Sequence, residues 1–120
     1  MQAEIKKLHS PDVYDLSSYR PDRENDFGFL LQVIVGIKGV DSEESFDMIV
    51  CTPSWLAEQF SKDDVVFGEH YLIVFEYNYS RIKKKLEKYV NSLEEENWEV
   101  LASKIDRIGR WEFRDYQEKS

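Results

Sequence analysis

An apolar alternation from Phe27 to Ile37 restricts the fold of this chain more than any other feature of its sequence. Successive side chains of a β-strand point to opposite faces, so apolar residues at every second position predict a strand with one buried side. The opposite face is diluted by glycine and glutamine. The apolar face consists of Phe27, Phe29, Leu31, Val33, Val35 and Ile37.

Three further segments have strand patterns. Residues 38–44 combine glycine with polar side chains, and the alternation that follows through Phe46, Met48 and Val50 predicts an antiparallel hairpin with an acidic tip. A short strand is expected over residues 3–8, ended by Pro11, and a polar loop over residues 12–26. Residues 71–77 are apolar on both faces, which is typical of a central strand.

Three helices are expected after the hairpin. Thr52 and Pro53 form a helix start, a second apolar stripe predicts a helix over about residues 79–93, and a third helix begins near Trp98 and ends by Gly109. Trp55 and Trp98 are expected to pack in the core, and residues 110–116 to form a short strand or a docked tail. The sequence therefore predicts one α+β domain over residues 1–120, with a mainly antiparallel sheet and three helices packed on it.

Composition narrows the class of function. The 120 residues carry 42% hydrophobic residues and a formal charge of −8, which suits a globular protein and disfavours a phosphate-binding surface. We interpret the basic run from Arg81 to Lys88 as a solvated helix face, so direct nucleic-acid binding is not expected. The single Cys51 excludes an internal disulfide, and no apolar run suggests a signal peptide or a membrane span. We expect a cytoplasmic protein without membrane contact.

No residue pattern predicts an active site. His9 and His70 lack metal-ligand spacing, and the glycines form no phosphate-binding loop, so neither a metal nor a cofactor is expected. One alternative stays open, a small hydrolase that would use Asp47, Glu76 and Cys51 if these side chains converged in a pocket. We interpret Cys51 as a residue packed among apolar side chains. We expect that the chain is not an enzyme.

Several segments together resemble the immunity protein 8 family of bacterial polymorphic-toxin systems. The order and spacing of these segments carry the resemblance over nearly the full length: Ala3-Glu-Ile-Lys with Leu8-His-Ser-Pro11, Phe27-Gly-Phe-Leu-Leu-Gln-Val33, Ser45-Phe-Asp with Val50-Cys-Thr-Pro and Trp55-Leu56, Leu72-Ile-Val-Phe-Glu-Tyr77, Arg107-Ile-Gly-Arg-Trp-Glu-Phe113, and Asp115-Tyr116. The resemblance implies a non-catalytic α+β antidote. Such a protein would bind the C-terminal domain of a cognate toxin, for example a basic nuclease, in a polymorphic or contact-dependent system. It would block the active or substrate-binding surface of that toxin.

Contact residues are predicted here from their charge and their place in loops. Carboxylates of the polar loop and of the hairpin tip could meet a basic toxin cleft, with tyrosines as anchors. The residues chosen are Tyr14, Tyr19, Asp22, Glu24, Asp26, Asp41, Glu43 and Glu44. A rival acidic patch at residues 94–96 also suits a helix N-terminus. A non-catalytic adaptor that pairs through Trp111 or a sheet edge is a further alternative, and the sequence does not distinguish monomer from homodimer.

Overall fold

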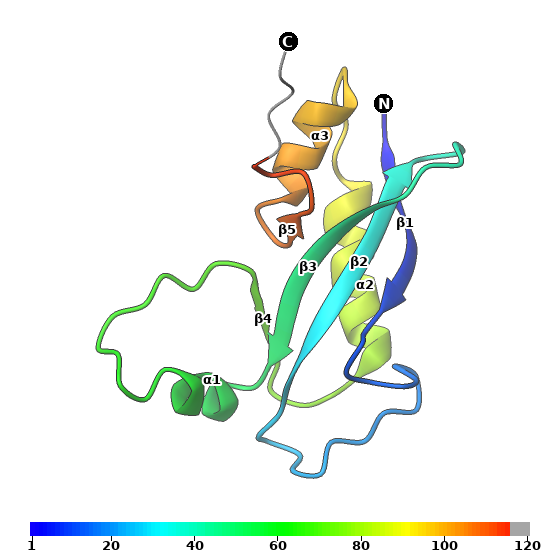
Figure 1. Cartoon of the computed structure of the whole chain (residues 1–120). Coiled ribbons are helices and arrows are strands. Elements are labelled where there is room, and N and C mark those ends of the chain that lie inside the picture. Colours follow the sequence, from blue (N-terminus) through cyan, green and yellow to red (C-terminus); the bar gives the residue numbers. More distant parts are fainter. Residues whose placement is uncertain (116–120) are drawn as a thin grey trace.

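The computed structural model describes residues 1–115 and contains one mixed sheet with three helices (Figure 1). The predicted α+β class is confirmed. The sheet has the order β1-β2-β3-β4, with β5 pairing to the same strand β3. In chain order the elements are β1 (Ala3–His9), β2 (Gly28–Ile37), β3 (Glu44–Cys51), α1 (Pro53–Gln59), β4 (Tyr71–Ile73), α2 (Tyr79–Asn91), α3 (Trp98–Ile105) and β5 (Arg110–Trp111).

The expected hairpin of β2 and β3 is confirmed, and its register explains the buried face. Leu31 lies opposite Met48 and Val33 lies opposite Phe46, so the apolar alternations of both strands face the same side. Strand β1 pairs antiparallel with β2 and contains an irregularity between Ile5 and Lys7. All strand pairs are antiparallel except β3 with β4, which is parallel.

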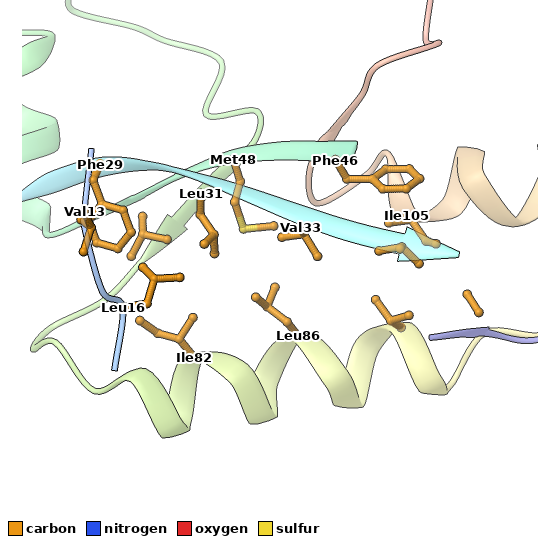
Figure 2. Close-up of a cluster of buried hydrophobic side chains, with 14 of the residues drawn as sticks. Val13, Leu16, Phe29, Leu31, Val33, Phe46, Met48, Ile82, Leu86 and Ile105 are labelled. Atoms are coloured by element: carbon orange, nitrogen blue, oxygen red, sulfur yellow. The ribbon is translucent and has the colours of Figure 1, made fainter. Parts of the chain in front are cut away.

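Helix α2 covers the apolar face of the sheet. Its buried side chains, Ile82, Leu86 and Val90, recur at helical spacing. Ile82 and Leu86 point toward β2 and β3 (Figure 2). Asn78 begins the helix, because its side chain accepts a hydrogen bond from the Arg81 amide at 3.1 Å. This layer is the centre of the hydrophobic core.

Helix α3 and β5 close one end of the core. The side chain of Asn97 caps α3, and Leu101, Ala102 and Ile105 are its buried residues. Trp98 packs edge-on against Phe46, as expected of a core-packed residue, and the ring of Trp111 also stacks with Phe46. The predicted short strand at the C-terminal end is β5, and Tyr116 lies outside the described residues. None of the helices within residues 1–115 has the length and apolarity needed to cross a membrane.

The prediction of a central strand over residues 71–77 is wrong. Strand β4 has three residues, lies at the end of the sheet order, and pairs parallel with the last three residues of β3. Strand β3 ends at Cys51, so the last backbone hydrogen bond between the two segments is donated by the Val74 amide to the Cys51 carbonyl, at 2.8 Å. Beyond this bond no neighbouring strand remains, and Phe75 is exposed.

The expectation that Trp55 packs in the core is also wrong. Helix α1 begins as predicted, with Thr52 as N-cap and Pro53 at the first position, but it buries no side chain. The half-buried Trp55 ring instead covers Gly28, where a Cβ atom would lie 2.3 Å from it. Helix α1 therefore projects from the sheet together with the segment that follows it (Figure 1).

Candidate partner-binding surface

The polar loop over residues 12–26 is firmly attached to the sheet. Asp12 accepts a hydrogen bond from the Leu30 amide at 2.9 Å, and Asp15 accepts bonds from both Ser17 and Ser18. These serine bonds hold the pKa of the Asp15 carboxyl below its usual value. Two apolar side chains of this loop, Val13 and Leu16, are buried in the core.

Tyr19 lies in an aromatic cluster beneath this loop. Its ring packs edge-on against Phe27, Phe29 and Tyr77, with centroid distances from 5.0 to 6.4 Å. The Tyr77 hydroxyl donates a hydrogen bond to the Leu16 carbonyl. Burial of that hydroxyl, with smaller contributions from neighbouring groups such as Tyr79, raises the pKa of Tyr77 to about 12. Tyr19 thus contributes to the attachment of the loop.

The other residues predicted in this loop lie at the surface. Tyr14, Asp22 and Glu24 are exposed, whereas Asp26 is half-buried and lies 3.4 Å from the guanidinium of Arg23. Exposed aromatic and carboxylate side chains have the character that the sequence suggested for a contact surface.

The hairpin tip contains the second predicted group. Asp41 and Glu43 are exposed, but the half-buried Glu44 accepts a hydrogen bond from the indole of Trp111 at 2.8 Å. The tip is compact, because the Ser42 hydroxyl accepts a bond from the Ile37 amide and Gly39 has a φ of 77°. Trp111 is thereby occupied within the chain, which weakens the adaptor alternative that relied on it.

The two predicted acidic groups lie at opposite ends of the sheet. The loop precedes β2 and the tip follows it, and the two ends of this ten-residue strand are about 30 Å apart. Figure 1 shows them on opposite sides of the fold. The structure does not bring the two groups together, so each is a separate candidate.

The residues of the hydrolase alternative do not converge. Asp47 and Cys51 are four positions apart on β3, which places them about 13 Å from each other. Cys51 is fully buried, and this burial raises the pKa of its thiol. Glu76 is exposed beyond β4, 3.7 Å from Arg81. Within residues 1–115 no group of three or more His, Cys, Asp or Glu side chains is arranged to hold a metal ion.

A third surface, which the sequence did not reveal, consists of the projecting connection between β3 and β4. We call residues 53–70 the α1 arm. Every residue from 61 to 69 is exposed, including Val65 and Phe67, whose exposed fractions are 91% and 99%. Ile73 and Phe75, which follow the arm, are 45% and 78% exposed. The apolar residues Val65, Val66, Phe67, Ile73 and Phe75 are hereafter called the arm patch.

Both ends of the α1 arm are held by the body of the protein. At the start, the buried Thr52 hydroxyl accepts a bond from the Phe27 amide at 3.1 Å. At the end, Arg114 forms ion pairs with Glu69 and with Asp106, and the hydrogen bond to Arg114 lowers the pKa of the Glu69 carboxyl. The arm is therefore an anchored projection whose middle contacts little else.

The resemblance to the immunity protein 8 family is supported by comparison with known families. The family model described as Immunity protein 8 matches residues 3–116. The chain belongs to the immunity protein 8 family. No curated protein and no solved structure matches the chain, so the family assignment rests on the match to the family model.

Membership of the immunity protein 8 family changes how the surface should be interpreted. Immunity proteins act by binding a toxin, so exposed features that the fold does not need become candidates for contact with that partner. Within residues 1–115 we consider three such surfaces, the polar loop, the hairpin tip and the arm patch, beside the rival acidic patch at residues 94–96, in which Glu94 and Glu96 are exposed. Only the first two carry a signal in the sequence, because exposed carboxylates stand out in a loop. The part of the arm patch at Ile73 and Phe75 resembles a core strand in its residue pattern.

Proposed function

We propose that this member of the immunity protein 8 family binds the C-terminal domain of a cognate toxin and blocks its active or substrate-binding surface. The observation that carries the proposal is the family match over residues 3–116. The toxin would belong to a polymorphic or contact-dependent system, and the antidote would act in the cytoplasm. The free, buried Cys51 is compatible with such a reducing compartment.

Electrostatics suggest how such an antidote works. The formal charge of −8 attracts a positively charged partner and accelerates encounter with it. Added salt weakens this attraction. A toxin that attacks nucleic acid needs a basic cleft for its substrate, so a basic nuclease is the partner class that this charge favours. Inhibition then needs no catalysis by the antidote, because occupation of the cleft excludes the substrate.

The test uses the toxin domain encoded beside this protein, in a catalytically inactive form. Titration calorimetry should give a one-to-one complex, and stopped-flow mixing should give an association rate that falls as salt rises. Co-expression with the active toxin should restore growth of the host. Absence of binding to that toxin domain, with both proteins folded, would refute the proposal.

A further inference from the structure

The α1 arm and the segment that follows it carry a group of exposed apolar side chains, the arm patch. Within residues 1–115, ten large hydrophobic residues are exposed, and half of them belong to the arm patch. Single exposed apolar residues are ordinary, whereas a cluster of them marks an interaction surface. The side chains of Val65 and Phe67 are almost completely exposed, so their burial contributes almost nothing to this fold.

Two hollows flank β4 and connect three residues of the arm patch, Val66, Ile73 and Phe75, whereas Val65 and Phe67 line neither of them. One, of about 600 Å³, lies between the arm and the strand and is lined by Val66 and Ile73, with Leu56 and Phe60 from the side of α1. The other, of about 430 Å³, lies between β4 and the start of α2, and Ile73 lines it as well, together with Phe75. Ile73 therefore joins the two hollows, which are open to side chains of a partner.

Carboxylates predominate on the arm and in the segment that follows it, whereas Arg81 and Lys85 of α2 line the far side of the second hollow. Residues 53–76 contain five acidic residues and one basic residue, Lys62, which gives a formal charge of −4, half the charge of the whole chain. Glu58, Asp63 and Asp64 are exposed on the arm itself. Hydrophobic anchors with charges around them are the usual anatomy of a specific interface, in which the apolar centre supplies affinity and the charges supply register and rate.

We infer that the arm patch is the surface that holds the cognate toxin. Val65 and Phe67 insert into an apolar depression of the toxin that is bordered by lysine and arginine side chains. The inference rests on the proposed function and adds to it the contact surface. A second copy of this chain is a poorer occupant, because a two-fold interface would place the same acidic surface against itself.

The experiment compares matched variants against the inactive toxin domain encoded beside this protein. Phe67→Ser and Val65→Ser remove apolar anchors without adding charge, and Val100→Ser, at an exposed position of α3, is the control for the same chemical change elsewhere. Phe67→Ser should raise Kd at least about 30-fold, as loss of a central anchor does, while Val100→Ser should stay within about twofold. The double variant Asp63→Asn/Asp64→Asn should slow association and reduce its salt dependence.

The outcomes test the proposed function and the arm inference separately. If the wild-type protein does not bind the toxin, the proposed function is refuted, and the arm inference with it. If wild type binds and Phe67→Ser binds equally well, while Tyr14→Ser or Asp41→Asn loses affinity, only the arm inference is overturned. A wild-type dimer in sedimentation velocity that dissociates in Phe67→Ser would also overturn it, because the patch would then be a self-association surface.

Discussion

In the two long connections of this sheet, the polarity of the sequence does not predict which apolar side chains are buried. The loop between β1 and β2 is polar, yet it places Val13 and Leu16 in the core. The α1 arm between β3 and β4 contains the apolar run Val65-Val66-Phe67, yet it leaves Val65 and Phe67 in solvent. The comparison teaches that burial follows the path of a segment over the core. Apolar residues held away from the core are available to a binding partner.

The largest effect is expected where the polar loop enters the core. Leu16→Ala removes a side chain that is 9% exposed and leaves a cavity beside α2, so the free energy of unfolding should fall by about 2–4 kcal/mol. Urea unfolding followed by circular dichroism measures it. A loss below about 0.5 kcal/mol, the range of ordinary surface substitutions, would show that the loop is not part of the core and would break the comparison.

A smaller effect is expected at the end of the α1 arm. His70 has a φ of 66°, a conformation that histidine tolerates and that a β-branched residue does not. His70→Val should lower the free energy of unfolding by about 1–2 kcal/mol, and His70→Asn should cost less because asparagine also adopts this conformation. The same urea assay compares them. Equal losses in both variants would assign the effect to the lost contact between the His70 ring and the Asp106 carbonyl.

Tyr77 gives a pH-dependent test of how the loop is attached. Its pKa is about 12 in the folded protein and 10.0 without burial, so between these pH values the unfolded chain holds fewer protons. Stability should therefore fall as pH rises through this window, with at most about 1.4 kcal/mol per pH unit from this group. Tyr77→Phe should remove that part of the slope and cost about 1 kcal/mol at neutral pH. Identical slopes above pH 10 would contradict the burial of the hydroxyl.

The smallest effect on stability is expected in the arm patch. Phe67→Ser and Val65→Ser should change the free energy of unfolding by less than about 0.5 kcal/mol, because neither side chain is removed from water by folding. Combined with a loss of toxin affinity, this result would separate binding from folding in one pair of variants. A loss of stability as large as that of Leu16→Ala would mean that the arm packs on the body in solution.

Much of the fold follows from local patterns in the sequence. The alternation after Phe27, the Thr52-Pro53 helix start and the apolar stripe of α2 each specify an element directly, since strand and helix periodicity decide which face is buried. The short β4 could not be predicted in this way. Its length depends on where β3 ends, which is a property of the partner strand. The predicted contact residues lie at two separate ends of the sheet, and their role in toxin binding stays a prediction.

The sequence by itself determined the class of fold, the family and the acidic character, because these depend on residue order, periodicity and composition. The tertiary structure alone decided which apolar residues are core and which are free. Tyr71 to Phe75 has the pattern of a buried strand, but its place at the edge of the sheet exposes its apolar residues Ile73 and Phe75. The physical reason is that burial depends on neighbours distant in the chain, and a local pattern carries no record of which neighbours will be present.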